Sequence, residues 1–327
     1  MKIVNFQIKN KIVLDMIDLY NDINNISNDS VLTVPYGFNG FLELILNSIG
    51  YDPIINLNKE FSNPIDIEST NNKVVVGFSS GFDSIYNSLK LLSCGYEPVL
   101  FHVKSLNKSY PDEFNKSISF AKDFGFDIVV LEVEDNNNPI FIDNPMKNQM
   151  ILSLMIEYGT QNNINKFAMG NNVNEKISEC RVQYGISDSI EMFTEYRNGI
   201  SKYFNNLEFF DILETKSNAY KFVGENFYKA FENVNSCITP HRFKKHLNKL
   251  NSNKFNITPL SDTRCMSCYK CAIEAILLDY NNIVEYPDDY IEHSYDIIRK
   301  KSDTIFTTKI ANKKSKNSEI LERLIEC

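Results

Sequence analysis

Two stretches of the sequence contain residues whose types and spacing could carry chemistry. The first, residues 79–84 (SSGFDS), follows the apolar run Val74–Phe78 and precedes a helical segment. Because a helix N-terminus has unpaired N–H groups and the positive end of the helix dipole, a loop of small residues leading into it can bind phosphate. Asp83 and Ser84 could cap that helix or help to hold Mg²⁺ or phosphate. A capped turn without a ligand is the structural alternative.

The second stretch is Cys265–Cys271, in which three cysteines follow the pattern Cys-x2-Cys-x2-Cys. Three thiolates at this spacing can converge on one tetrahedral zinc ion, and a fourth ligand must come from elsewhere. Cys237 is the best candidate, and His241 and His246 are alternatives because imidazole also binds zinc. An iron–sulfur cluster, or buried cysteines without a metal, would also fit the pattern.

Composition limits the class of protein. With 327 residues, of which 43% are hydrophobic, the chain can form one large packed domain or two. The net charge of −8 makes broad attraction to nucleic acid unexpected, although an acidic chain can still contain a local basic patch. We expect a cytoplasmic protein without membrane contact, because the sequence lacks a signal peptide and any run of about 18 apolar residues. In that compartment the seven cysteines are expected as thiols or metal ligands rather than disulfides.

The elements that position the first stretch alternate along the chain. Strands are expected at 74–78, 98–104, 127–133 and 166–170, and helices at 83–93, 112–124 and 146–159. Strands separated by helices of this length indicate βαβ units and a parallel sheet. Right-handed crossovers would place the loops 79–83, 104–112, 134–145 and 170–190 along one edge of the sheet, where we expect a ligand.

The strand–SSGFDS–helix unit resembles the Ser-Gly-Gly-x-Asp-Ser signature of the PP-loop ATP pyrophosphatases, which cleave ATP between its α and β phosphates. It lacks the Gly-Lys-Ser or Gly-Lys-Thr ending of the Walker P-loop. The resemblance implies a Rossmann-like α/β fold, with ATP and Mg²⁺ as cofactors and Asp83 and Ser84 as catalytic residues. Ser80 departs from the signature, which has its first Gly there. The residues implied to bind the nucleotide are Ser79, Ser80, Gly81, Phe82, Asp83 and Ser84.

Together, the two stretches are similar to the 7-cyano-7-deazaguanine synthase (QueC) branch of that superfamily, which pairs the phosphate loop with a C-terminal four-cysteine zinc site. The resemblance covers approximately residues 73 to 280. Between Cys237 and Cys265, the 27 residues 238–264 exceed the short spacing of the family. The zinc ligands implied by the resemblance are Cys237, Cys265, Cys268 and Cys271.

Further residues match positions of the family less specifically, and each of them could instead be an ordinary surface residue. Lys147 and Asn148 stand where the branch has Arg and Asn at the nucleotide, so Lys147 is a further catalytic candidate and Asn148 a substrate-binding one. Either Glu179 or Asp188, which follow the fourth strand, could accept a hydrogen bond from a purine-type N–H, and their spacing does not favour one over the other. The remaining substrate-binding candidates are Gly170, Glu179, Asp188 and Lys216.

The resemblance implies an ATP-dependent carbon–nitrogen ligase. The carboxylate of 7-carboxy-7-deazaguanine would be adenylated and passed to an amine. Ammonia would give the amide and then 7-cyano-7-deazaguanine, whereas a protein amine would give a deazaguanine–protein conjugate, as in QueC-like proteins of antiviral defence operons. A tRNA-thiolating enzyme and an amidating ligase similar to NAD synthetase are alternatives within the superfamily. A non-catalytic ATP-binding zinc scaffold is another.

The domain organisation that we expect has four parts. Residues 1–70 form an N-terminal extension, with strand-like runs at Lys2–Ile8 and Val31–Pro35 and a helix near Phe41–Ile49. The extension would be a packing element or homodimer arm, or a module that recognises a protein partner. Residues 71–200 form the ATP-binding α/β domain, and residues 301–327 a tail. Residues 201–300 form a helical zinc-binding region, with helices expected at 217–233, 239–250, 269–280 and 286–299.

Overall fold

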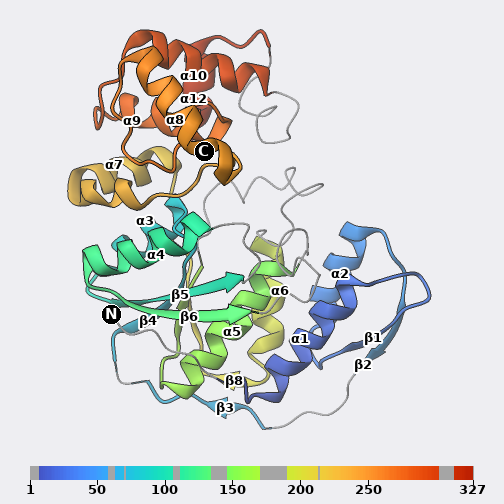
Figure 1. Ribbon diagram of the computed structural model, residues 1–327. Coiled ribbons are helices and arrows are strands. Elements are labelled where there is room, and N and C mark those ends of the chain that lie inside the picture. The colour runs from blue at the N-terminus through green and yellow to red at the C-terminus, as the bar shows by residue number, and fades with distance from the viewer. Residues whose placement is uncertain are drawn as a thin grey trace.

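A central parallel sheet organises the protein. The computed structural model describes residues 7–57, 63–69, 71–105, 111–133, 146–169, 190–212, 214–301 and 313–326. Five strands pair in the order β6-β5-β4-β7-β9, every pair parallel (Figure 1). The expected α/β class with a parallel sheet is therefore confirmed. The strands are β4 (Lys73–Gly77), β5 (Glu97–Ser105), β6 (Asp127–Val133), β7 (Lys166–Ala168) and β9 (Glu208–Phe210).

The sheet is apolar on both faces because helices cover both. Leu100 and Val130 pack with α3 (Phe82–Ser93), α4 (Pro111–Phe124) and the C-terminal helices on one face. Val75 and Phe101 pack on the other face with α5 (Lys147–Gln161), α1 (Lys11–Asn24), α2 (Asn39–Ile49) and α6 (Ile190–Ile200). Side chains alternate between the faces along each strand, so a strand covered on both sides reads as a continuous apolar run.

The N-terminal section shares the main core. The strand expected at Lys2–Ile8 is wrong where it can be checked, because Gln7 and Ile8 are not in a strand and α1 follows directly. Apolar residues recur in α1 at helical spacing and are buried. The strand at 31–35 and the helix at 41–49 are confirmed as β1 (Val31–Val34) and α2. The smaller strand pairs are β1 with β2 (Ile54–Leu57), and β3 (Ile65–Asp66) with β8 (Phe204–Asn205).

Glu157 on α5 anchors the start of α1. Its buried carboxylate accepts hydrogen bonds from the backbone N–H groups of Lys9 (2.8 Å) and Asn10 (3.1 Å). It also accepts bonds from the side-chain amides of Asn10 (2.7 Å) and Gln161 (2.5 Å). One buried side chain thus satisfies backbone donors that precede the first helical turn.

We expect Glu157→Ala to lower the free energy of unfolding by about 2 to 3 kcal/mol, because it leaves partly buried backbone donors unpaired. Urea unfolding measures this change. Glu43→Ala, on the exposed side of α2, is the matched control and should change stability by no more than about 0.5 kcal/mol. Equal effects of the two substitutions would contradict the anchoring role.

The C-terminal region is helical, as expected, and gathers at one end of the molecule (Figure 1, top). The helix expected at 217–233 is α7 (Lys216–Phe227), continued by a 3₁₀ helix over Tyr228–Asn233. None of the helices that the structure describes is long and apolar enough to cross a membrane. The other helices are α8 (His241–Phe255), α9 (Tyr269–Tyr280), α10 (Asp288–Lys300) and α12 (Asn317–Glu326).

Candidate functional site

The loop at residues 78–81 leaves the carboxyl end of β4, the central strand of the sheet. From β4 the chain passes through α3 to β5 on one side, whereas α5 later leads to β7 on the other side of β4. The direction in which strands are added therefore reverses at β4. Ligands of open α/β sheets bind outside the carboxyl ends of the strands at such a switch point.

Ser80 adopts the conformation that the loop requires. Its φ of 54° lies in the left-handed region, which favours glycine and costs most other residues about 1 kcal/mol or more. The buried Ser80 hydroxyl donates to the carbonyl oxygen of Glu113 (3.2 Å), and the Ser80 carbonyl accepts from the N–H of Asn235 (2.8 Å). The Gly-to-Ser departure is thus located at a position of positive φ, and the serine side chain makes a bond that glycine cannot make.

The N–H groups at the start of α3 are bonded to hydroxyl oxygens. The Phe82 N–H donates to Ser236 Oγ (3.1 Å), and the Gly81 N–H to Ser79 Oγ (3.4 Å). Ser84 Oγ donates to the Gly81 carbonyl (2.9 Å) and accepts from the Ser79 N–H (3.4 Å). These hydroxyls occupy the acceptor positions that phosphate oxygens take at a helix N-terminus. The Phe82 ring itself is buried and stacks on Tyr220, with centroids 3.7 Å apart.

Asp83 and Lys216 lie side by side at this loop. Their carboxylate and ammonium groups are 3.7 Å apart, with side chains 33% and 24% exposed. Lys216 is the first residue of α7, and the preceding Thr215 caps the helix by accepting from the Asn218 N–H (3.3 Å). The fold therefore brings together, at the start of α3, two residues that are more than 130 positions apart in the sequence.

The other predicted site residues divide into two groups. Lys147 and Asn148 open α5. Burial raises the pKa of the Glu113 carboxyl, and the nearby charge of Lys147 opposes part of that rise. Three predicted substrate-binding residues lie outside the described residues, namely Gly170, Glu179 and Asp188.

Four residues that the sequence analysis missed contact this loop or its support. Asn235 and Ser236 bind the loop from just before Cys237, and Lys244 donates to Asn235 Oδ1 (3.2 Å). Burial raises the pKa of Glu113 to about 7, against the opposing charges of Lys147 and Lys244. No local pattern could have found these residues, because the contacts join positions 33 and 154 apart in the sequence.

The raised pKa of Glu113 predicts a dependence of stability on pH. Between about pH 4.5 and 7, the native state binds a proton that the unfolded state has lost, so stability falls as pH rises through this window. With about 1.4 kcal/mol for each pKa unit, the loss is at most about 3.5 kcal/mol. Glu113→Gln should therefore gain stability relative to the parent protein between pH 5 and pH 8, as measured by urea unfolding. Parallel pH profiles for the two proteins would contradict this assignment.

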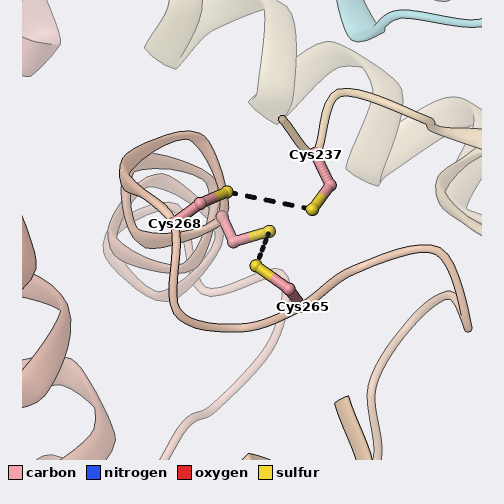
Figure 2. Close-up of side chains that lie close together, drawn as sticks. Cys237, Cys265 and Cys268 are labelled. Carbon is pink, nitrogen blue, oxygen red and sulfur yellow. Dashed lines mark hydrogen bonds between the residues drawn. The ribbon is translucent and has the colours of Figure 1, made fainter. Parts of the chain in front are cut away.

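The second site is a cluster of four cysteine side chains. The Sγ atoms of Cys237, Cys265, Cys268 and Cys271 all lie within 4.8 Å of one another. Figure 2 shows Cys237 pointing toward Cys268. The sulfurs of Cys237 and Cys268 are 3.9 Å apart, and those of Cys265 and Cys271 are 4.0 Å apart. A disulfide would need about 2.05 Å. Four thiolates about 2.3 Å from one zinc ion would be about 3.8 Å apart. The cluster therefore has the size of a tetrahedral zinc site.

Neighbouring groups favour ionisation of one thiol in particular. Hydrogen bonds from Cys237, Cys268 and Cys271 lower the pKa of the Cys265 thiol, and Thr239 Oγ1 also donates to its sulfur (2.9 Å). The hydrogen bond with Cys237 raises the pKa of the Cys271 thiol well above its usual range. Against the opposing hydrogen bond with Cys265, those with Cys268 and Cys271 also lower the pKa of the Cys237 thiol, to about 6. A bound cation is the ordinary means of stabilising all four thiolates.

The fourth position of the cluster belongs to Cys237 rather than to either histidine. His241 Nδ1 instead contacts Asp112 Oδ2 (2.7 Å), and His246 is exposed on α8 outside the cluster. Residues 238–264 form a loop and α8, which returns the chain to Cys265. The long spacing therefore does not prevent Cys237 from joining the other three cysteines.

Comparisons with known proteins add little to this geometry. No protein-family model and no curated protein matches the chain. A solved structure described as a predicted subunit of tRNA methyltransferase from Methanocaldococcus jannaschii is similar at 17% identity, over 43% of this chain and 67% of that chain, with a TM-score of 0.29. A similarity of this size carries no argument about function. Fold and site together define an α/β protein with a loop at its switch point and a four-cysteine cluster that could bind zinc.

Proposed function

We propose that the protein is an ATP-dependent ligase, which activates a carboxylate as its adenylate and transfers the acyl group to an amine. The observation that carries the proposal is the position of the SSGFDS loop. It lies at the switch point of the sheet, opens α3, and has the Asp83–Lys216 pair beside it. The loop resembles the PP-loop signature, which implies that ATP binds here and is cleaved between its α and β phosphates. This is also the position at which α/β proteins bind nucleotides.

In this proposal the loop binds the phosphates. The N–H groups of Gly81 and Phe82 exchange their hydroxyl acceptors for phosphate oxygens, and the dipole of α3 favours the negative charge. Lys216 stabilises the charge that develops on pyrophosphate. Asp83 offers the carboxylate oxygen that Mg²⁺ prefers, and Ser84 holds the loop through its bonds to Ser79 and Gly81.

The carboxylate that we propose is 7-carboxy-7-deazaguanine, from the combination of this loop with the four-cysteine cluster. A carboxylate oxygen attacks the α-phosphorus and pyrophosphate leaves. An amine then attacks the acyl carbon, loses a proton, and AMP leaves. Ammonia gives the primary amide, which a second activation converts to the nitrile, whereas a protein amine gives a conjugate. Zinc would have a structural role, because four thiolate ligands complete its tetrahedron.

Product analysis tests this proposal. AMP and pyrophosphate are measured with ATP and Mg²⁺, with and without 7-carboxy-7-deazaguanine, in the presence of ammonia, and the small molecules are identified by mass spectrometry. We expect AMP formation that depends on the carboxylate, with an amide or nitrile product. AMP formation without an ammonia product would favour a protein amine. A complete absence of AMP would contradict the ligase proposal.

A second candidate function is ATP binding without turnover. It is favoured by one observation, namely that hydroxyl groups of the protein itself already occupy the N–H groups of Gly81 and Phe82. Calorimetry of ATP binding, together with the assay for AMP, separates the two candidate functions. A binding protein would take up ATP with a measurable heat but produce no AMP with the carboxylate present.

A further inference from the structure

Helix α8 carries a line of exposed basic side chains, three of them lysine or arginine and one a histidine. Arg242, Lys245, His246 and Lys249 are all exposed, and at 100° per residue they lie within about a third of the circumference of the helix. We call these four residues the cationic stripe. The buried residues of α8, Lys244, Asn251 and Phe255, lie on the opposite side. The stripe is thus the solvent face of a helix whose other face is packed.

Among the described residues, the structure shows no acidic partner for the charges of the stripe. Residues 233–261 contain no Asp or Glu, although the whole protein has a net charge of −8. Within the part of the chain that the structure describes, Arg242, Lys245 and Lys249 form no ion pair. The neighbouring carboxylate of Asp112 instead contacts His241 and the buried Lys244. The stripe therefore presents uncompensated positive charge to solvent.

Helix stability does not account for these charges. The first turn of α8 has no acidic residue, and Arg242 stands near the positive end of the helix dipole, where a cation is unfavourable. Acidic or neutral side chains there would stabilise the helix by a few tenths of a kcal/mol or more. A cationic first turn at a cost in stability points to a use outside the protein.

Exposed apolar groups flank the stripe on one side. The Phe243 side chain is 46% exposed, and the Arg242 guanidinium lies 4.7 Å from the centre of its ring. Leu250, two turns further along, is 54% exposed. A planar ring beside a guanidinium group can stack with a nucleobase, while lysines on the same helix face attract phosphates. The helix offers both kinds of contact in a length of about 10 Å.

We propose that the cationic stripe of α8, with Phe243 beside it, binds single-stranded nucleic acid. Phosphates lie along Arg242, Lys245 and Lys249, and a base stacks on the Phe243 ring beside Arg242. The stripe starts next to the candidate nucleotide site, because His241 contacts Asp112 and the adjacent Glu113 accepts from Ser80. Binding depends on three local charges against an acidic protein, so it is weak and sensitive to salt. This inference is independent of the ligase reaction.

The test uses the full-length, zinc-loaded protein with fluorescein-labelled dT15 and U15 oligonucleotides in anisotropy titrations between 50 and 200 mM NaCl. Three phosphate contacts predict a slope of about −2 for the logarithm of the binding constant against the logarithm of salt concentration. In Arg242→Gln/Lys245→Gln/Lys249→Gln, we expect affinity at 50 mM salt to fall at least about tenfold and the slope to approach zero. The melting temperature should be unchanged or higher, because the helix dipole is less opposed.

A matched control removes the same charge elsewhere. Lys122, Lys202 and Lys221 are exposed on α4, after α6 and on α7, and their triple Gln variant should retain oligonucleotide binding. Phe243→Ala should weaken binding at constant salt slope. Equal losses in the two triple variants, or no oligonucleotide binding at 50 mM salt, would overturn the proposal. Competition by poly-glutamate as strong as by oligonucleotide, with no effect of Phe243→Ala, would also overturn it and assign the stripe to an acidic polypeptide.

Discussion

Replacing Cys268 with Ser is expected to release zinc and to melt the C-terminal helical region. The parent protein should contain about one zinc ion per chain, because four sulfurs have tetrahedral spacing. Binding at such a site contributes on the order of 10 kcal/mol, and this free energy is also folding free energy. Loss of one thiolate should therefore remove several kcal/mol of stability. Elemental analysis by mass spectrometry gives the metal content, and circular dichroism gives the loss of helix.

The chain supplies a matched control for that experiment. Cys94 follows α3 as an exposed thiol outside the cluster, so Cys94→Ser should keep the zinc and the melting temperature. A chelator added to the parent protein should reproduce the effect of Cys268→Ser. A stable parent protein that contains no zinc would contradict the metal assignment, whatever the variants do.

Asp83→Asn is expected to abolish most carboxylate-dependent AMP formation while the protein remains folded. The substitution keeps the shape of the side chain but removes the charge beside Lys216, at the start of α3. Loss of one preorganised electrostatic group at such a position lowers kcat by about a hundred- to a thousandfold. The side chain is partly exposed, so stability should change by no more than about 1 kcal/mol. Initial rates of AMP release and thermal unfolding measure the two effects.

Asp52→Asn is the control for this variant, because Asp52 is exposed in the N-terminal section, away from the loop. It should retain the parental rate. If Asp83→Asn retains the parental rate as well, Asp83 has no part in the reaction and the role proposed for the loop is wrong. If both variants bind ATP but neither they nor the parent form AMP, the binding protein is the better description.

The sequence predicts the central sheet well because its strands are buried on both faces. Val74, Val75 and Val76 form a continuous apolar run, which is typical of a strand buried on both faces. Gly95 and Gly125 have positive φ and mark the ends of the helices between the strands. The short strands are less predictable. β3 and β8 have two residues each and form through pairing with each other, which no local pattern indicates. Helix α1 is missed although its apolar residues recur at helical spacing, which is a local pattern. Only the anchoring of its start is non-local, because Glu157 lies 147 positions from Asn10.

The residues of the candidate site also differ in whether a local sequence pattern indicates them. Loop residues 79–84 and the three clustered cysteines are visible in the sequence because their spacing is local. For the fourth ligand the sequence favours Cys237 but leaves His241 and His246 open, and the place of Cys237 beside Cys268 comes from the fold. Glu113 and Ser236 could not be found at all, since a backbone carbonyl or a hydroxyl group becomes part of the site only when tertiary structure brings it to the loop.

The bonds from Asn235 and Ser236 to the SSGFDS loop have a thermodynamic consequence. These two residues immediately precede Cys237, so a single short segment contacts both the helix start and the cysteine cluster. A ligand that displaces Ser236 from the Phe82 N–H moves a neighbour of a metal ligand. Thermodynamic linkage makes such an effect reciprocal. If the bound metal changes the affinity of the loop for its ligand by some factor, the bound ligand changes the affinity of the four thiolates for the metal by the same factor.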